Sequence, residues 1–311
     1  MEKSSFVHVA VGVIRRENGD ILIAQRPEHL HQGGLWEFSG GKVEENETVE
    51  QALTRELHEE LAIRVESCES LIQIRHHYAD KSVLLDVWTI ESFSGIPDGR
   101  EGQPIRWVAA NELQNYAFPA ANHAIIYAAQ LPSCYAILDD EQPQELMENL
   151  QKLLVQNIKL IQARLKNLSA LAVESFLQHA LPLCEKHHAH LLLNSAVKTN
   201  FSCEKRGLHL TSDDLMQLSE RPKLNNWLAA SCHTLAQLQH AEKIGVDFAV
   251  LSPVLPTQTH PTAAPLGWET FAEWVTHVNI PVYALGGLQK TDKMFAKKCG
   301  AQGIAGIRTF L

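Results

Sequence analysis

The pattern of apolar residues changes at Leu131-Pro132-Ser133, and this change restricts the possible folds more than any other feature of the chain. Before it, short apolar runs surround one amphipathic stretch at 48–61. After it, short apolar runs alternate with helical stretches. Repeated strand–helix units are typical of a parallel sheet, and the chain is long enough for two domains. We therefore expect two α/β domains, at 1–131 and 133–311.

The first part has the pattern of short strands around one main helix. Apolar runs at 6–14 and 21–24 flank Asn18-Gly19, a strong hairpin signal. Further runs follow at 72–76, 83–91 and 105–108. The stretch 48–61 lacks Gly and Pro, and its helical spacing places on one face Val49, Leu53, Leu57 and Leu61.

The second part has eight apolar runs of strand length, which suggests a closed (β/α)₈ barrel. Helical stretches separate most of them. Because the given chain stops at Leu311, directly after the eighth run, we expect a barrel without a full final helix. The eight runs are 135–138, 158–162, 190–193, 208–210, 227–230, 248–251, 282–285 and 303–307.

The formal net charge of −9 resides entirely in residues 1–130. This charge disfavours binding to a nucleic-acid polymer or an anionic membrane. An acidic domain that binds an anionic substrate needs a positive partner, usually a divalent metal ion. No apolar run approaches the ~20 residues of a membrane span. The first residues also lack a signal-peptide pattern, so we expect a cytoplasmic protein.

Three glutamates, Glu56, Glu59 and Glu60, stand at positions i, i+3 and i+4 of the predicted helix. This spacing brings three carboxylates to one face while leucines bury the other face. Like charges repel unless a cation neutralises them, and all-oxygen ligation suits Mg²⁺ or Mn²⁺. The alternative is a solvated acidic face, which most glutamate-rich helices have.

The surroundings of these glutamates resemble the Nudix box, G-x5-E-x7-R-E-U-x-E-E-x-G-U with U aliphatic. The run from Gly41 matches every defined position except Ala62, where the pattern has glycine. The segments AVGVIRRENGDILIAQRP, LWEFSGGKVE, GREGQP and FPAAN resemble the MutT branch over about residues 5–130. The resemblance implies an α/β/α sandwich with a mixed sheet. It also implies hydrolysis of oxidised purine nucleotides such as 8-oxo-dGTP, which serves nucleotide-pool sanitisation and DNA repair.

The same resemblance implies roles for the acidic residues. Glu101, in the REGQ loop, is a further metal ligand or the general base, although Glu56 is the first choice for the base. Arg55 orients Glu47 or a neighbouring carboxylate through a charge-assisted bond. The other implied metal ligands are the Gly41 carbonyl, Glu56, Glu59 and Glu60.

Four residues are candidates for substrate binding: Arg26, Phe38, Lys81 and Asn122. The resemblance makes Asn122 the purine reader, since an amide can donate and accept at adjacent atoms of a base edge. The alternative for Asn122 is a helix N-cap. Phe38 keeps the family's aromatic residue, although Ser39 replaces the usual proline. Arg26 and Lys81 are candidates for phosphate or sugar contacts, with a solubilising surface role as the alternative.

The implied reaction is metal-assisted hydrolysis at the β-phosphorus of a nucleoside triphosphate, giving a monophosphate and pyrophosphate. Two other functions stay open. The first part can act on pyrimidine or thiamine diphosphates, or it can be a binding module without turnover. Retention of Glu56 and Glu101 speaks against a binding module, and Asn122 favours a purine.

The second part resembles thiamine-phosphate synthase and its relative TenI, a thiazole tautomerase. The likeness rests on the segments IQARLK, GLHL, ASCHT, SPVLPTQT and ALGGL. They lie at or just after predicted strand ends, where barrel enzymes place active sites. The resemblance implies a phosphorylated thiazole or pyrimidine ligand, with candidate contacts at Gln162, Arg164, Lys166, Asp214, Ser231, His233, Gly286 and Gly287.

Two departures indicate that the synthase activity is degenerate. Asn194-Ser195 stands where the synthase has an Asn-Asp pair, and His260 stands where a lysine follows the Pro-Thr-x-Thr run. Asp214 is then the remaining carboxylate, and one carboxylate is a weak ligand set for holding Mg²⁺ against a pyrophosphate. The alternatives are a tautomerase-like role through His233, a phosphate-ligand sensor and a purely architectural barrel. A homodimer also stays open.

Overall fold

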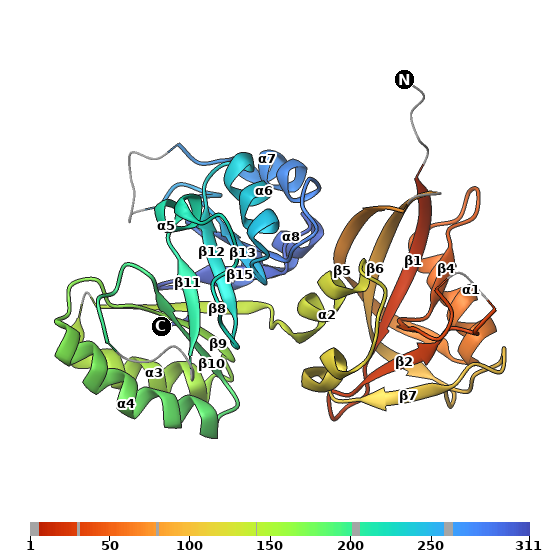
Figure 1. Cartoon of the computed structure of the whole chain (residues 1–311), viewed down its shortest axis with the longest axis horizontal. Helices are drawn as coiled ribbons and strands as arrows, with labels where there is room; N and C mark the ends of the chain where they lie inside the picture. Colours follow the sequence, from red (N-terminus) through yellow and green to blue (C-terminus); the bar gives the residue numbers. More distant parts are fainter. Residues whose placement is uncertain (1–5, 30–31, 79–80, 141, 201–205, 258–263) are drawn as a thin grey trace. The chain divides into compact units, whose positions relative to one another are not determined.

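The structure, a computed structural model, describes residues 6–29, 32–78, 81–140, 142–200, 206–257 and 264–311. His260 lies outside these described residues. The chain divides into two compact units, Met1–Gln130 and Leu131–Leu311 (Figure 1). Within the described ranges, every helix is too short or too polar to cross a lipid bilayer.

The first unit contains two small sheets. One has the strand order β4-β1-β6-β5 and the other has the order β3-β2-β7. The first sheet is mixed, because β1 pairs parallel with β6 and antiparallel with β4. The strands are β1 (Val7–Ile14), β2 (Ile21–Gln25), β3 (Trp36–Glu37), β4 (Gly40–Lys42), β5 (Arg64–His77), β6 (Ser82–Ser94) and β7 (Ile105–Val108).

Successive residues of β1 alternate between two cores, which places helices on both sides of the strands. Ala10 and Ile14 pack against the leucines of α1 (Val49–Leu61). Val11 and Val13 belong to the second core, which includes residues of α2 (Asn122–Gln130). A short 3₁₀ helix, η1 (Ala110–Asn115), precedes α2. The unit is therefore the expected α/β/α sandwich with a mixed sheet.

Helix α1 begins where its sequence predicts. Thr48 is the N-cap, and its hydroxyl accepts a hydrogen bond from the Gln51 N–H at 3.3 Å. The Gln51 side chain accepts one from the Thr48 N–H at 2.8 Å, completing a capping box. The helix ends at Ala62, whose φ of 57° is left-handed. The buried face consists of Ala52, Leu53, Leu57 and Leu61, which leaves the glutamates on the other faces.

The second unit is a closed barrel of parallel strands in the order β10-β11-β12-β13-β14-β15-β8-β9. The strands are β8 (Cys134–Asp139), β9 (Leu160–Arg164), β10 (His190–Asn194), β11 (Gly207–Leu210), β12 (Leu228–Cys232), β13 (Phe248–Leu251), β14 (Val282–Leu285) and β15 (Gly303–Gly306). The helical segments are η2 (Pro143–Glu145), α3 (Leu146–Val155), α4 (Ala170–Lys186), α5 (Ser212–Gln217), α6 (Leu235–Ile244), α7 (Gly267–Val275), η4 (Lys290–Asp292) and α8 (Lys293–Lys298). The closed ring of eight parallel strands confirms the expected barrel.

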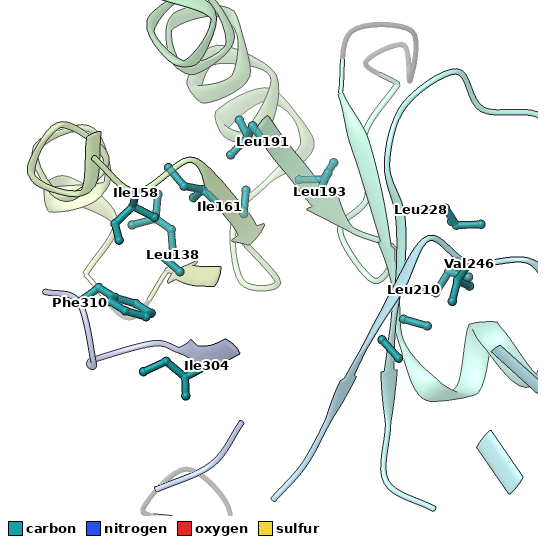
Figure 2. Packing of buried hydrophobic residues seen from close by; sticks show 14 of the residues in the cluster. Leu138, Ile158, Ile161, Leu191, Leu193, Leu210, Leu228, Val246, Ile304 and Phe310 are labelled. Atoms are coloured by element: carbon teal, nitrogen blue, oxygen red, sulfur yellow. The ribbon is translucent and has the colours of Figure 1, made fainter. Parts of the chain in front are cut away.

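The barrel has two apolar layers, because alternate strand residues face opposite sides. Ile161 and Leu193 belong to the layer between strands and helices (Figure 2). Their neighbours Leu160 and Leu192 pack inside the barrel with the large aromatic residues. Polar residues take over at the carboxyl ends of the strands, where Arg164 ends β9 and Asn194 ends β10. This end is where a ligand can approach.

Candidate functional site

Arg55 fastens helix α1 to the loop before it. Its Nε and Nη2 donate to Glu47 Oε1 and Oε2 at 3.0 and 2.9 Å. Its Nη1 donates to Glu56 Oε1 at 2.8 Å, and Nη2 also donates to the Lys42 carbonyl at 3.0 Å. Hydrogen bonds to Glu47 and Glu56 raise the pKa of Arg55, and the bond from Arg55 lowers the pKa of Glu47. The structure thus gives Arg55 the position of a residue that orients carboxylates.

Four carboxylates act on one another around Glu60. Burial raises the pKa of Glu60 to about 8, and the charges of Glu37, Glu101 and Glu56 act in the same direction. Burial also raises the pKa of Glu37, although Arg26 Nη1 donates to its carboxylate. This concentration of negative charge is what a bound cation would relieve.

The loop at 98–103 brings Glu101 to this group by binding the end of α1. The Glu60 carbonyl accepts hydrogen bonds from the Arg100 N–H at 2.9 Å and from Gln103 Nε2 at 3.0 Å. Gln103 Oε1 accepts from the Glu101 N–H at 2.8 Å. The last carbonyls of a helix have no partner within it, so the loop satisfies them and is itself held in place.

Gly41 lies directly against the Glu56 carboxylate. A Cβ atom at this position would come within 2.1 Å of Glu56 Cδ and Oε1. Any other residue would therefore push the carboxylate away. The glycine of the sequence motif is needed for this close approach between the backbone of β4 and the side chain of α1.

The donor atoms of this site suit a hard divalent cation, since they are carboxylate and carbonyl oxygens. Among the described residues, however, no three acidic, histidine or cysteine side chains stand together at metal-ligand spacing. Glu59 is the most separate of the predicted ligands: its side chain is 60% exposed and its Oε2 is 3.7 Å from Arg55 Nη1. The site has the charge and the donors for a cation, while Arg55 and Arg26 set the present positions of Glu56 and Glu37.

Phe38 and Asn122 are both buried: Phe38 belongs to the second core of this unit, and Asn122 begins α2, which contributes residues to that core. Phe38 stacks on Phe118 with ring centroids 5.4 Å apart. Asn122 is the first residue of α2 and is 8% exposed. Its side-chain amide makes no hydrogen bond with any residue that the structure describes. The amide therefore does not cap the helix, and its donor and acceptor are available to a ligand.

Sequence reasoning missed Glu37, although the strand pattern contains a signal for it. Trp36 and Phe38 belong to the second core. Glu37 lies between them and must point to the opposite face, toward Glu60 and Glu101. Arg26, predicted as a phosphate or sugar contact, is placed at this group by its bond to Glu37. Lys81 is exposed beside the start of β6, and it makes no side-chain bond to the carboxylates among the residues that the structure describes.

Most of the predicted barrel residues line one cavity of about 690 Å³. Gly287 instead lines a neighbouring cavity of about 620 Å³, which Gly286 shares. Gly287 has a φ of +68°, and a Cβ there would come within 2.4 Å of the Pro256 carbonyl oxygen. The residues in the first cavity are Gln162, Arg164, Lys166, Asp214, Ser231, His233 and Gly286.

A chain of buried hydrogen bonds runs from the barrel interior to this cavity. Gln162 Nε2 donates to the Tyr135 hydroxyl at 3.2 Å, and that hydroxyl lies 3.0 Å from His209 Nδ1. His209 Nε2 lies 2.8 Å from Ser231 Oγ. Burial lowers the pKa of His209 to about 3, so the imidazole is neutral. With the Tyr135 hydroxyl donating to Nδ1, the Nε2–H donates to Ser231.

Hydroxyl groups hold Asp214 at the edge of the cavity. Thr211 Oγ1 donates to Asp214 Oδ2 at 2.7 Å, and Ser195 Oγ donates to the same oxygen. The Thr211 N–H donates to Ser195 Oγ at 2.9 Å, and the Asp214 N–H donates to Thr211 Oγ1 at 3.1 Å. The bonds from Ser195 and Thr211 lower the pKa of Asp214.

Comparison with protein-family models divides the chain as the fold does. The model described as thiamine monophosphate synthase matches residues 134–310, and the NUDIX domain model matches residues 10–128.

Each of the curated relatives likewise matches one of the two parts of the chain. The putative thiamine-phosphate synthase 2 of Aquifex aeolicus (strain VF5) is 36% identical over 184 residues, covering 58% of this chain and 99% of that protein. The 8-oxo-dGTP diphosphatase of Escherichia coli (strain K12) is 38% identical over 120 residues, with coverages of 39% and 93%. The CTP pyrophosphohydrolase of the same strain is 36% identical over 122 residues, with coverages of 39% and 90%.

Proposed function

This chain belongs to the thiamine monophosphate synthase family through residues 134–310 and to the NUDIX family through residues 10–128, and from this premise we propose that its first unit is a Mg²⁺-dependent nucleoside triphosphate pyrophosphohydrolase. The proposed substrate is an oxidised purine nucleotide, 8-oxo-dGTP, which is cleaved to 8-oxo-dGMP and pyrophosphate. The observation that carries this proposal is the group of carboxylates around Glu60, whose mutual repulsion is suited to a cation and a polyphosphate.

The proposed roles follow from the positions of the side chains. Mg²⁺ or Mn²⁺, when bound, supplies positive charge that offsets the triphosphate and makes water more acidic. The residues that would hold it are Glu56, Glu59, Glu60, Glu101 and the Gly41 carbonyl. Glu56 is the first choice for the general base, because Arg55 and Gly41 fix its carboxylate. Glu101 is the competing choice.

The purine preference is supported by Asn122. Its buried amide is unused by the described residues and can donate and accept at adjacent positions of a base edge. A site that offers paired polar groups discriminates strongly against a ligand that leaves them unpaired. The stacked rings of Phe38 and Phe118 belong to the same core as the helix that begins at Asn122.

A panel of substrates tests this function. Mg²⁺-dependent release of pyrophosphate or phosphate is measured with 8-oxo-dGTP, dGTP, CTP and thiamine diphosphate. We expect kcat/KM for 8-oxo-dGTP to exceed the other values by at least about tenfold. A preference for CTP or thiamine diphosphate would replace the purine proposal with the pyrimidine or cofactor alternative, and absence of release from all four would overturn the hydrolase.

Substitution of the proposed base tests the site itself. Glu56→Gln should lose nearly all turnover while retaining the circular dichroism spectrum of the native chain. The matched control is Glu66→Gln, on the exposed part of β5, which should keep full activity. Unchanged turnover in Glu56→Gln would refute the assignment of this site.

For the second unit we propose a binding site for a phosphorylated thiazole or pyrimidine, with the full synthase activity lost. Ser195, which stands in place of a carboxylate, supports the loss. Incubation with thiazole phosphate and pyrimidine diphosphate tests it, and formation of thiamine phosphate would overturn it. His233 supports a tautomerase-like role as the second candidate, because Nδ1 lies 2.8 Å from the Ser252 carbonyl and the ring lines the cavity.

A further inference from the structure

The barrel cavity is lined by charged groups of both signs. Their positions determine which groups can bind the phosphate of a ligand. Among the described residues that line it, the ionisable cations are Arg164 and Lys166, and the carboxylates are Asp213 and Asp214. Burial lowers the pKa of Lys166, the charge of Arg164 acts in the same direction, and the carboxylate of Asp214 opposes both. The two cations therefore lie near each other at the carboxyl ends of the strands, with one acidic neighbour.

The family resemblance implies a Mg²⁺ ion at this end of the barrel, and the residues present do not fit one. Mg²⁺ is held in proteins by one or two carboxylates together with waters and substrate phosphates, at demanding octahedral geometry. Ser195 replaces one carboxylate. Asp214 Oδ2 already accepts hydrogen bonds from the hydroxyls of Ser195 and Thr211. An ion at Oδ2 would have to displace both donors, which leaves Oδ1 as the one oxygen of this carboxylate without a hydrogen bond from the described residues, and Ser195 offers a neutral hydroxyl in place of the second carboxylate.

The hydroxyl groups of Ser195 and Thr211, which together form what we call the clamp on Asp214, are themselves fixed by further hydrogen bonds. Ser195 Oγ accepts from the Thr211 N–H, and Thr211 Oγ1 accepts from the Asp214 N–H. Thr211 is the N-cap of helix α5, so releasing its hydroxyl would also uncap the helix. The bonds from Ser195 and Thr211 stabilise Asp214 in its charged form, which is why its pKa lies below the usual value.

We propose that the barrel cavity binds the phosphate or pyrophosphate group of its ligand without a divalent cation, so that Lys166 and Arg164, which the resemblance already assigns to the ligand, supply the positive charge alone. This inference rests on the ligand-binding role proposed above for the second unit. The carboxylate of Asp214, held by Ser195 and Thr211, then favours the charged form of Lys166 beside the anion. A guanidinium and an ammonium together supply the charge that the family site takes from a metal.

The experiment uses the full chain and inorganic pyrophosphate as the probe, with binding measured by isothermal titration calorimetry in EDTA and in Mg²⁺. EDTA removes the divalent cation that the proposed site of the first unit needs, so this unit should not contribute to the binding measured in EDTA. We expect wild-type protein to bind pyrophosphate in EDTA. Lys166→Met should weaken this binding by at least about tenfold. The matched control is Lys186→Met, at the exposed end of α4, which should bind as wild type does.

A second variant tests the clamp itself. Ser195→Asp restores a second carboxylate beside Asp214. We expect its pyrophosphate binding in EDTA to be weaker than that of wild type by about tenfold, because the added charge repels the anion, and we expect Mg²⁺ to restore the binding. Binding in EDTA as tight as that of wild type would contradict the proposed exclusion of the metal.

The outcomes separate this inference from the proposals on which it rests. If wild type binds pyrophosphate only with Mg²⁺, and Lys166→Met removes that binding, the cavity is a ligand site but the metal-independent mode is overturned. If no Lys166-dependent binding occurs in either buffer, both the inference and the ligand-binding role fall. The hydrolase proposal is judged separately, by pyrophosphate release from nucleotides.

Discussion

The guanidinium group of Arg55 binds the carboxylate of Glu47 through two parallel hydrogen bonds, from Nε to Oε1 and from Nη2 to Oε2. The two residues are eight positions apart, so the pair joins the body of helix α1 to the loop in front of it. The remaining nitrogen, Nη1, holds Glu56. Because this planar fork is rigid, Arg55 fixes the position of Glu56, the proposed general base.

The first prediction concerns this fork. Lysine keeps the charge of Arg55 but cannot make two parallel bonds and a third to Glu56. We expect Arg55→Lys to lower kcat/KM by about 10- to 100-fold, since a small displacement of a catalytic group has effects of that size. Arg16→Lys, at an exposed ion pair with Asp20, is the matched control and should leave kcat/KM unchanged. Equal values for the two variants would exclude Arg55 as a positioning residue.

The second prediction concerns Glu37, whose charge acts on Glu60 and Glu101. Glu37→Gln keeps an oxygen that can accept from Arg26 and removes one negative charge. Cation attraction should weaken, so the Mg²⁺ concentration that gives half-maximal activity should rise by about three- to tenfold. The measurement is a Mg²⁺ titration of pyrophosphate release. Glu17→Gln, on the exposed first hairpin, should titrate as wild type does, and the same curve for Glu37→Gln would remove Glu37 from the site.

The third prediction concerns base recognition. Asn122→Ala removes both polar groups of the amide, so the preference for 8-oxo-dGTP over dGTP should collapse toward unity. The ratio of the two kcat/KM values is the measurement. The matched control is Asn115→Ala, at the exposed end of η1, the short helix that precedes α2. It should leave the ratio of the two kcat/KM values unchanged. An unaltered ratio in Asn122→Ala would take the residue out of the pocket.

The elements that could be predicted from the sequence are those whose local pattern and final environment agree. Helix α1 has apolar residues at helical spacing, and a capping box begins it. The barrel strands are buried on both sides and read as continuous apolar runs, so all eight were expected. Helix α5 (Ser212–Gln217) has a weak helical pattern in the sequence, because it has six residues and Leu215 is its one buried side chain. Strand β5 begins at Arg64, ahead of the predicted 72–76, because its polar first half is held by pairing with β6.

The residues of the candidate site also differ in how far the sequence alone predicts them. Glu56 and Glu60 were predictable because they belong to one continuous motif. For Glu37 the strand pattern predicts only the face of the side chain, because its role depends on the approach of three segments that are distant in sequence: β3, α1 and the loop at 98–103. The clamp on Asp214 also needs two strand ends to meet. Ser195 follows β10 and Thr211 follows β11, and these neighbouring parallel strands bring the two hydroxyls to one carboxylate.

The fourth prediction concerns Ala62, where the family motif has glycine. Ala62 has a φ of 57°, in the left-handed region that costs an L-residue about 1 kcal/mol relative to glycine. Ala62→Gly should therefore raise the free energy of unfolding of the first unit by about 0.5–1 kcal/mol. Ala172→Gly, the same change in the ordinary helix α4, should lower stability by a similar amount. A loss of stability in Ala62→Gly, measured by urea unfolding, would show that the left-handed cost is outweighed by the Cβ contacts.

The last prediction concerns the buried His209. Its folded-state pKa of about 3 lies below the ordinary value of 6.5, so the unfolded chain takes up a proton that the folded barrel does not. The resulting contribution to stability is complete above pH 6.5 and is lost as the pH falls toward 3. Between pH 7 and pH 5 this residue alone should cost the barrel about 2 kcal/mol of unfolding free energy. Urea unfolding at a series of pH values measures the loss.

The variant His209→Gln should be less stable than wild type at pH 7, because the bonds to Tyr135 and Ser231 are disturbed. Its stability should nevertheless fall less steeply with acid, since glutamine takes up no proton. His179→Gln, on the exposed face of α4, controls for the loss of a histidine and should retain the wild-type slope. A His209→Gln slope equal to that of wild type would mean that other groups cause the acid sensitivity. A shallower slope would show that the neutral imidazole between Tyr135 and Ser231 ties the stability of the barrel to pH.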